Sequence, residues 1–223
     1  MNLLTTSNFK VSKTNEFNDK YLLSIMHLYP NKIVCPDASP GCMRACLVSA
    51  GYGKMKSVTK ARAIKTKLYL NNTTDFLTVL EKNIDSHVKK AKKENKHPSI
   101  RLNGTSDIAW EKHAIIKKYS NVLFYDYTKT YDRMVKFLTD SSWPKNYYLT
   151  FSRSETNEEE CKKVLELGGT IAVVFKDAIP ETYYGYKTIN GDEHDLRFLD
   201  GKSVVIGLSA KGLAKEDKSG FLV

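Results

Sequence analysis

Residues 121–151 read NVLFYDYTKTYDRMVKFLTDSSWPKNYYLTF and contain the strand–helix–strand pattern that decides the fold class. Val122–Tyr127 and Tyr147–Phe151 are short, apolar and rich in β-branched and aromatic residues, which is typical of buried strands. Between them, Tyr131–Leu138 has the length and apolar spacing of a short helix. Two such strands joined by a helix predict a βαβ unit, in which the strands pair in parallel.

The same alternation continues on both sides of this unit. Further strands are predicted at Tyr21–Leu28, Lys32–Val34, Ser99–Asn103, Thr170–Phe175 and Ser203–Leu208, and further helices at Ser57–Leu70, Thr74–Glu94, Trp110–Tyr119 and Glu158–Leu167. Counted from the strand that precedes Cys35, about six strands alternate with helices along the chain. We therefore expect one α/β domain over residues 1–223, a partial (β/α)6 TIM-like barrel with a mostly parallel sheet. The irregular stretch Asp177–Lys202 contains turn residues, which predict an inserted hairpin or lid.

Three of the four cysteines lie together in the sequence CPDASPGCMRAC, at positions 35, 42 and 46. This C-x6-C-x3-C spacing lets one loop place its sulfurs around a metal, and thiolates favour zinc or iron–sulfur clusters. A closed structural zinc site needs a fourth ligand, and His27 is the only histidine placed to supply one. Three ligands alone suit a cluster with one open iron. The alternative is three reduced thiols without a metal, whereas Cys161 is expected in a helix core.

The formal net charge of +10 is concentrated in the first hundred residues, which hold 17 Lys and Arg against 7 Asp and Glu. Most of this excess lies between Lys54 and Lys96, a stretch that could follow a nucleic-acid backbone. The alternative is a solvated helix face. No apolar run approaches the ~18 residues that cross a bilayer. We therefore expect a soluble protein of the cytoplasm, without membrane contact.

Polar residues follow each predicted strand. Gly104, Thr105, Ser106 and Asp107 come after the second strand, where small and hydrogen-bonding residues let a ligand approach the backbone. Ser152, Arg153, Ser154 and Asn157 follow the fourth strand and precede a helix, a position that suits an anionic group. We predict that these eight residues bind a cofactor. Alternatively, Ser154 or Thr156 caps the helix and Arg153 forms a structural ion pair.

Several common catalytic motifs are missing. The sequence contains no HExxH pair for a zinc hydrolase and no Gly-x-Ser-x-Gly elbow for a serine hydrolase. It also contains no phosphate-binding GxxxxGK[ST] loop and no strand-linked GxGxxG. These absences argue against the corresponding enzyme classes.

A strand, a three-cysteine loop and further βα units together resemble the radical S-adenosylmethionine architecture. The chain is similar in particular to a family of small phage-encoded proteins that carry the C-x6-C-x3-C motif. For a phage-encoded protein, the expected location is the cytoplasm of the host cell. The matching segments are Cys35–Cys46 with Gly51, Arg101–Asp107 with Trp110, Tyr125–Thr128, Ser152–Asn157 and Gly207–Gly212.

The resemblance implies that Cys35, Cys42 and Cys46 hold a [4Fe–4S] cluster whose open iron binds S-adenosylmethionine. It also places residues 104–107 where these enzymes hold the methionine amino group. Two features depart from the prevailing radical-enzyme pattern. The usual spacing is C-x3-C-x2-C with an aromatic residue before the last cysteine, where this chain has Ala45, and Gly-Thr-Ser-Asp replaces a Gly-Gly-Glu type segment.

Two functions of different classes follow from these features. The first is a radical-enzyme-like iron–sulfur protein that modifies a nucleic acid or a host component. The second is a non-catalytic protein, stabilised by a cluster or zinc, that binds nucleic acid through residues 54–96. A phage protein that binds a host protein is a third possibility, for which the sequence holds no motif.

Overall fold

The computed structural model describes residues 1–6 and 8–223. Six strands form the centre of one sheet and pair in parallel in the order in which they occur along the chain. They are β2 (Tyr21–Met26), β3 (His97–Arg101), β4 (Leu123–Thr128), β5 (Tyr147–Ser152), β6 (Ile171–Phe175) and β9 (Val205–Ser209). The mostly parallel α/β sheet predicted from the βαβ pattern is therefore confirmed.

Short strands border this parallel core on both sides. β1 (Leu4–Thr5) pairs antiparallel with β2, and β8 (Tyr186–Asn190) pairs in parallel with β9. β7 (Thr182–Tyr183) completes the order β1-β2-β3-β4-β5-β6-β9-β8-β7. Among the residues that the structure describes, no pairing joins the two outer strands, so the sheet is open rather than a closed barrel.

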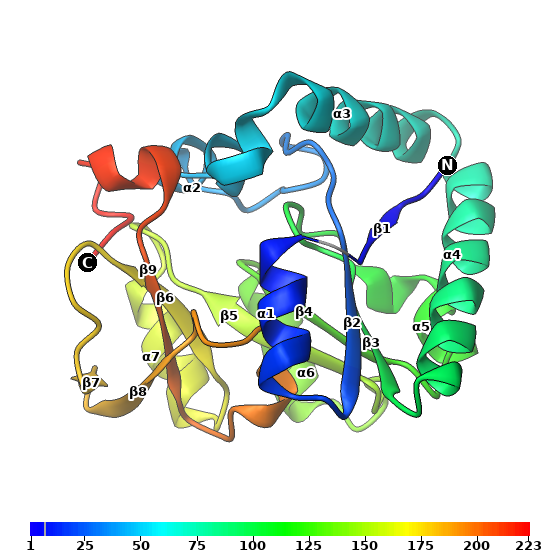
Figure 1. Ribbon diagram of the computed structural model, residues 1–223. Coiled ribbons are helices and arrows are strands. Elements are labelled where there is room, and N and C mark those ends of the chain that lie inside the picture. The colour runs from blue at the N-terminus through cyan, green and yellow to red at the C-terminus, as the bar shows by residue number, and fades with distance from the viewer. Residues whose placement is uncertain (7) are drawn as a thin grey trace.

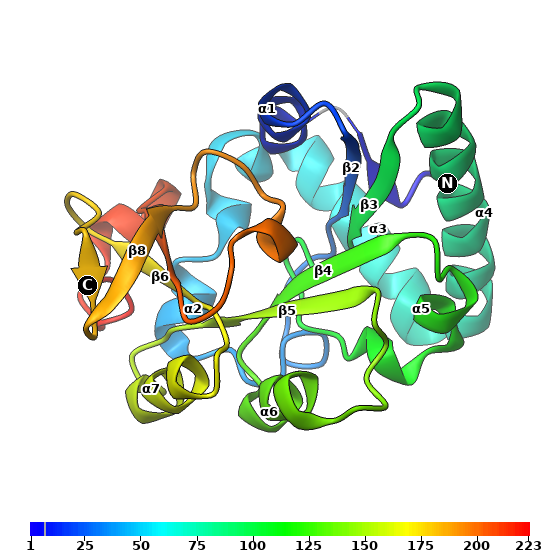
Figure 2. The ribbon, with the colours of Figure 1, turned by 90° about the horizontal axis from the view of Figure 1, so that it is seen from below.

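Helices cover both faces of a curved sheet, as Figure 2 shows. The convex face packs against α4 (Thr73–Lys93), α5 (Ala114–Lys118), α6 (Tyr131–Thr139) and α7 (Glu158–Glu166). The concave face is covered by α1 (Phe9–Phe17) and by the 3-10 helix Arg197–Leu199. At the carboxyl ends of the strands, α2 (Pro40–Arg44) and α3 (Lys56–Asn71) cross above the sheet (Figure 1).

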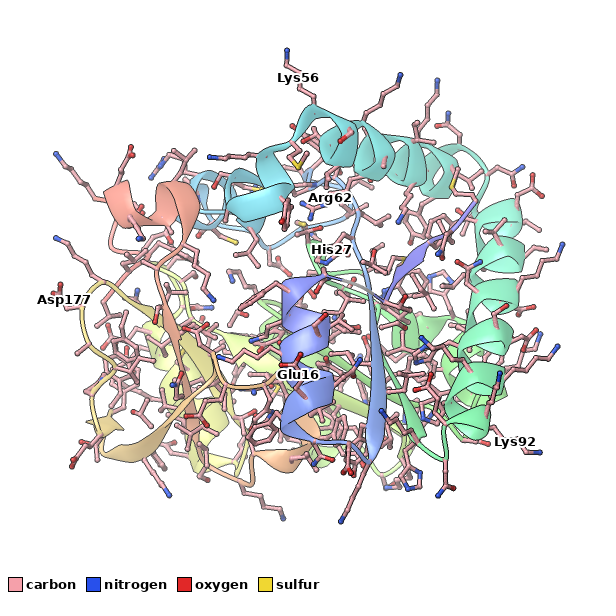
Figure 3. All side chains as sticks on the ribbon, in the orientation of Figure 1. Glu16, His27, Lys56, Arg62, Lys92 and Asp177 are labelled. Atoms are coloured by element: carbon pink, nitrogen blue, oxygen red, sulfur yellow. The ribbon has the colours of Figure 1, made fainter. Side chains whose placement is uncertain are left out.

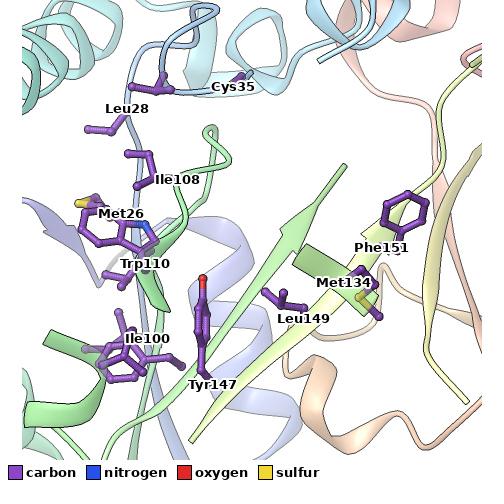
Figure 4. Packing of buried hydrophobic residues seen from close by; sticks show 14 of the residues in the cluster. Met26, Leu28, Cys35, Ile100, Ile108, Trp110, Met134, Tyr147, Leu149 and Phe151 are labelled. Atoms are coloured by element: carbon purple, nitrogen blue, oxygen red, sulfur yellow. The ribbon is translucent and has the colours of Figure 1, made fainter. Parts of the chain in front are cut away.

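The main core lies between the convex face and its helices (Figure 4). Trp110, Tyr147 and Phe151 are fully or almost fully buried there, and Cys35 sits at the upper end of the same packed layer. Burial of side chains of this size supplies most of the driving force for folding, at roughly 25 cal/mol per Å² of apolar surface. Within the described residues, no helix combines the length and apolar character needed to cross a bilayer.

The predicted strand at Lys32–Val34 is wrong. These residues form a turn, because the Asn31 side-chain oxygen accepts hydrogen bonds from the backbone N–H groups of Ile33 (2.8 Å) and Val34 (3.1 Å). The backbone oxygen of Asn31 also accepts from Cys35 N–H (2.9 Å). Such side-chain bonds compete with strand pairing, and Ile33 is consequently exposed rather than buried.

The predicted helix Trp110–Tyr119 is interrupted. A 3-10 helix covers Trp110–Lys112, His113 has extended backbone angles (φ −96°, ψ 143°), and α5 covers only Ala114–Lys118. The hairpin expected within Asp177–Lys202 is confirmed as β7–β8. Its two turn residues, Tyr184 (φ 53°) and Gly185 (φ 78°), both have positive φ, as a type I′ turn requires.

A buried polar network joins α6 to the loops that follow β3 and β4. The Arg133 guanidinium lies 2.8 Å from an Asp107 oxygen and 2.8 Å from a Glu111 oxygen, and it also donates to the Tyr147 hydroxyl at 2.5 Å. The Tyr147 hydroxyl in turn donates to the Asp126 carboxylate at 2.7 Å. Every charge in this network therefore has a partner, which is the condition for burying charge.

Replacing Arg133 should destabilise the fold strongly. Arg133→Met keeps most of the side-chain volume but leaves Asp107 and Glu111 buried without their cation, and such a loss costs about 3–5 kcal/mol. Lys136→Met on the same helix is the matched control, because Lys136 is exposed. Urea denaturation measures both free energies of unfolding. Equal losses in the two variants would contradict the role given to Arg133.

Candidate functional site

The cysteine loop lies above the carboxyl ends of the parallel strands (Figure 1). Cys35 follows β2 after the Asn31 turn, Cys42 lies inside α2, and Cys46 immediately precedes the 3-10 helix Leu47–Ser49. Ser39 caps α2, since its hydroxyl oxygen accepts a hydrogen bond from Cys42 N–H at 3.1 Å. One short segment thus brings three thiols to the end of the sheet where ligands bind in parallel α/β folds.

All three thiols are free and close enough to act on one another electrostatically. Burial, followed by the charges of Cys46, Asp107 and Cys42, raises the pKa of the Cys35 thiol to about 12. Burial also raises the pKa of Cys46, while the positive charges of Arg62 and Lys129 act in the opposite direction. These two cations favour the thiolate form, which is the form that binds metals.

The chemistry of the donor set fits a metal–thiolate site, but the side chains do not stand in a ready ligand arrangement. Among the described residues, no three His, Cys, Asp or Glu side chains are grouped as ligands of one ion. Cys35 Sγ instead donates to the backbone oxygen of Thr105 at 3.8 Å. Metal binding at this loop would therefore require the thiols to turn toward one another.

Cys161 and His27 have surroundings of their own. Cys161 is fully buried on α7, with its Sγ 3.7 Å from the Asn157 side-chain oxygen, as expected for a helix core residue. His27 Nε2 lies 3.5 Å from Asn8 Nδ2, and its Nδ1 faces the backbone of Gly104 so closely that a Cβ there would come within 2.6 Å. Both ring nitrogens of His27 thus face neighbours other than the cysteine loop.

The residues predicted after β3 hold the loops together. Gly104 N–H donates to Met26 O at 2.9 Å, an approach that leaves no room for a side chain. The Thr105 hydroxyl donates to Leu28 O at 2.6 Å, and the Ser106 hydroxyl donates to the Asn103 side chain at 2.8 Å. The Asp107 carboxylate accepts from Arg133, from the Thr128 hydroxyl (3.1 Å) and from Lys129 N–H (2.7 Å). Thr105 lies beside Cys35, whose Sγ is 3.8 Å from the Thr105 backbone oxygen, and Asp107 N–H donates to Val34 O at 2.7 Å. The side-chain polar groups of residues 105–107 are already hydrogen-bonded.

The residues predicted after β5 form a second bonded loop. The Asn157 side chain accepts from Ser154 N–H at 2.6 Å and donates to Ser152 O at 3.0 Å. Arg153 donates to the backbone oxygens of Gly220 and of Phe221, the latter at 2.9 Å, and so fixes the 220–221 backbone beside the loop. Neither Ser154 nor Thr156 caps α7, whose first flanking residue is Asn157. The expected ion pair of Arg153 is not found among the described residues.

Glu155, which sequence analysis did not select, attaches this loop to the cysteine loop. One carboxylate oxygen accepts from the Ser39 hydroxyl and the other from Gly41 N–H, both at 2.7 Å. Burial alone would raise the pKa of Glu155, but these hydrogen bonds bring it below its ordinary value. Gly41 has no space for a side chain, because a Cβ would lie 2.7 Å from Glu155 and from Phe221. Glu155 therefore anchors the start of α2, the helix that carries Cys42.

The lysine-rich stretch 54–96 extends over two helices and the 3-10 helix that precedes them. It is divided between α3, which crosses the top of the molecule in Figure 1, and α4, which runs down its side. Figure 3 shows Lys56 projecting upward at the start of α3 and Lys92 at the distant lower end of α4. Of these two helices, α3 is the one that follows the cysteine loop, through the 3-10 helix Gly51–Lys54.

Stability should fall with pH between about 6.5 and 3 because of His27. Burial, followed by the charge of Arg62, lowers the pKa of His27 to about 3, against about 6.5 in an unfolded chain. Within that window the unfolded chain binds a proton that the folded chain does not. The contribution of neutral His27 is complete above pH 6.5 and is lost as the pH falls, by at most ~1.4 kcal/mol per unit.

Urea denaturation of the wild type and of His27→Gln at several pH values tests this expectation. The stability difference between the two proteins should shrink from pH 7 to pH 4. Parallel profiles would show that His27 does not titrate in this way.

Removing Glu155 should loosen the cysteine loop without unfolding the sheet. Glu155→Ala removes two hydrogen bonds to a charged group, worth about 1.5–3 kcal/mol each, so local opening should rise roughly tenfold or more. The rate of Cys42 alkylation, followed by mass spectrometry, measures that opening. Glu159→Ala, at an exposed position on α7, is the control and should leave the rate unchanged. Equal rates in both variants would refute the anchoring role.

No curated protein and no solved structure matches the chain. The family model described as Gene product 88 matches residues 2–223, almost the entire sequence. This match confirms the expected relation to a family of phage-encoded proteins. The chain belongs to the Gene product 88 family.

Proposed function

We propose that this protein is a radical-enzyme-like iron–sulfur protein in which Cys35, Cys42 and Cys46 hold a [4Fe–4S] cluster with one open iron. The observation that carries the proposal is the position of the cysteine loop. Its three free thiols come from one short segment, Cys35–Cys46, at the carboxyl end of the first strand of the parallel series, while Cys161 lies on α7.

The strand order supports this proposal. In the six central strands, neighbours in the sheet are also neighbours along the series, as they are in a (β/α) barrel that has not closed. A doubly wound sheet would instead reverse its order at a switch point. We take the fold as a partial (β/α)6 barrel, whose active groups gather at the strand ends beneath the cysteine loop.

When bound, a reduced cluster of this kind would supply the electron for cleavage of S-adenosylmethionine into methionine and a 5′-deoxyadenosyl radical. The chain itself would orient the ligands and exclude water. Arg62 and Lys129 favour the thiolate form of Cys46, and Glu155 fixes the helix that carries Cys42. Gly104 lets the loop after β3 pack closely against Met26 and His27, and the hydrogen-bonded loops 104–107 and 152–157 would shape the pocket for the methionine part of the cofactor.

A second function, nucleic-acid binding with a zinc- or cluster-stabilised loop, is favoured by one surface feature. Tyr52 is 75% exposed beside the cysteine loop, and the nearby Lys54, Lys56 and Lys60 are also exposed. An aromatic side chain among cations suits stacking on bases together with contacts to phosphates. This function predicts an affinity for nucleic acid that falls steeply with salt.

Anaerobic purification with iron, sulfide and zinc analysis tests the first proposal. We expect about four irons and four sulfides per chain, as three thiolates around a cubane cluster require. Alanine at position 35, 42 or 46 should abolish the cluster, and the control Cys161→Ala should retain it. Loss of the metal in Cys161→Ala would contradict the open-iron site, and about one zinc per chain would favour the second function. A protein that carries the cluster should cleave S-adenosylmethionine when it is reduced.

A further inference from the structure

Large apolar side chains are exposed on three short 3-10 helices and the residue that follows them, beside α2 at the upper left of Figure 1. The three helices are Leu47–Ser49, Gly51–Lys54 and Gly212–Glu216, and the first contacts both of the others. The exposed side chains, which we call the apolar patch, are Leu47 (47% exposed), Tyr52 (75%), Met55 (48%) and Leu213 (53%). Neighbouring exposed apolar groups mark interaction sites, unlike apolar residues scattered singly over a surface.

Close backbone packing holds the three 3-10 helices together. A Cβ on Gly53 would come within 2.5 Å of the Leu47 backbone oxygen. Leu213 N–H donates to the Ser49 hydroxyl at 3.3 Å, and a Cβ on Gly212 (φ 56°) would come within 2.9 Å of Ser49 O. Both glycines therefore permit approaches that a side chain would prevent. Because its base is packed in this way, the apolar patch is preorganised, which lowers the entropic cost of binding.

An open cavity of about 480 Å³ lies beside the apolar patch. The residues that line it are Arg44, Leu213, Glu216, Asp217, Lys218 and Ser219. The Asp217 carboxylate already accepts hydrogen bonds from the Ser219 hydroxyl (2.7 Å) and from Phe221 N–H (3.1 Å). Arg44 and Leu213 thus offer a cation and an apolar wall to an incoming side chain, and anchor side chains buried in such pockets contribute most to an interface.

The segments that carry the apolar patch have an excess of positive charge. Residues 44–60 contain four Lys and Arg and no Asp or Glu, whereas residues 211–218 contain three Lys and two acidic residues. Lys211 is paired with Asp192, which lies outside these segments. Arg44, Lys54 and Lys215 are exposed and form no ion pair within the part of the chain that the structure describes. Negative charge on a partner would therefore be complementary to this surface.

The apolar side chains favour a protein partner over a nucleic acid. Leu47, Met55 and Leu213 have no aromatic ring and gain free energy only where a partner covers them with apolar groups. Single-stranded nucleic acid instead needs several aromatic rings on which successive bases stack, and Tyr52 is the one aromatic residue of the patch. A protein segment with both aliphatic side chains and carboxylates matches the patch and its cations together.

We propose that the apolar patch is a docking surface for an acidic, amphipathic segment of a partner protein. Apolar side chains of the partner cover Leu47 and Leu213, and one of them enters the cavity beside Leu213. Carboxylates of the partner pair with Arg44, Lys54 and Lys215. The inference goes beyond the proposed function, because the surface uses none of the three cysteines and needs neither a metal nor a nucleic acid.

Fluorescence anisotropy of the full chain with a labelled synthetic peptide tests the docking surface. The peptide repeats Leu and Glu with helical spacing, and two control peptides replace either its leucines by Ser or its glutamates by Lys. The Leu–Glu peptide should bind about tenfold or more tightly than either control, because it alone supplies both apolar contacts and negative charge. No binding of the Leu–Glu peptide, or equal binding of the serine peptide, would overturn the proposal.

The double variant Leu47→Ser with Leu213→Ser should weaken binding of the Leu–Glu peptide about tenfold or more, because it removes two apolar contacts. Both side chains are largely exposed, so their replacement leaves the core intact. Leu167→Ser is the matched control, since Leu167 is 48% exposed at the end of α7, and should have no effect. Equal weakening in the two proteins would show that these leucines do not form the docking surface.

Charge reversal and a second ligand complete the test. Lys54→Glu with Lys215→Glu should weaken binding of the Leu–Glu peptide, whereas Lys92→Glu on α4 should not. Equal effects of these variants would reduce the attraction to net charge and contradict the proposed pairing. A single-stranded oligonucleotide that binds more tightly than the peptide, with an affinity unchanged by the double serine variant, would assign the surface to nucleic acid and overturn the protein partner.

Discussion

The buried guanidinium of Arg133 is the interaction on which the strand-end architecture depends. It reaches from α6 to the carboxylates of Asp107 and Glu111, and through the Tyr147 hydroxyl to Asp126. Desolvating these groups is costly, and only a complete set of partners offsets that cost. Asp126 is fully buried, and burial raises its pKa to about 7 although hydrogen bonds from Asn103 N–H and the Tyr147 hydroxyl act in the opposite direction. The ion pairs of Arg133 with Asp107 and Glu111 therefore fix the loop after β3, which is part of the candidate site.

Most polar residues at the mouth of the sheet have structural tasks. The side chains of Thr105, Ser106 and Asn157 form hydrogen bonds with neighbouring backbone and side-chain groups. Groups at this end of the sheet that make no hydrogen bond within the described residues include His27 Nδ1, Arg62 Nη1 and Arg153 Nε. This contrast separates residues that position the site from groups that remain available to a ligand.

Elements set by local pattern were predictable from the sequence, and elements set by distant contacts were not. Val122–Tyr127 has a strong β-forming composition, and the observed strand, Leu123–Thr128, lies within one residue of it. The helix α1 was not predicted because its sequence, FKVSKTNEF, is mostly polar, and two of its apolar residues, Phe9 and Phe17, are exposed. The Asn8 side chain caps its first turn. The prediction of a strand at Lys32–Val34 was wrong because the Asn31 side chain accepts hydrogen bonds from the backbone N–H groups of Ile33 and Val34.

The same distinction applies to the candidate site. The position of the cysteine loop after β2 followed from the order of the elements. The role of Glu155 could not follow, because its partner Ser39 is 116 residues away and nothing in either local sequence indicates the other. The inward orientation of Arg62 could not be predicted either, because the sequence of a lysine-rich helix does not indicate which of its cations points toward the protein.

The distance between Ser39 and Glu155 also has a consequence for biosynthesis. A ribosome adds roughly 5–20 residues per second, so the cysteine loop leaves the exit tunnel on the order of ten seconds before its anchor. During that interval the three thiols belong to a nascent chain without a completed sheet beneath them. Their exposure to oxidants and to metal donors is greatest then, and it falls when β5 and the Glu155 loop dock and leave Cys42 and Cys46 half-buried. The order of translation thus gives the loop a period of wider access than the folded protein offers.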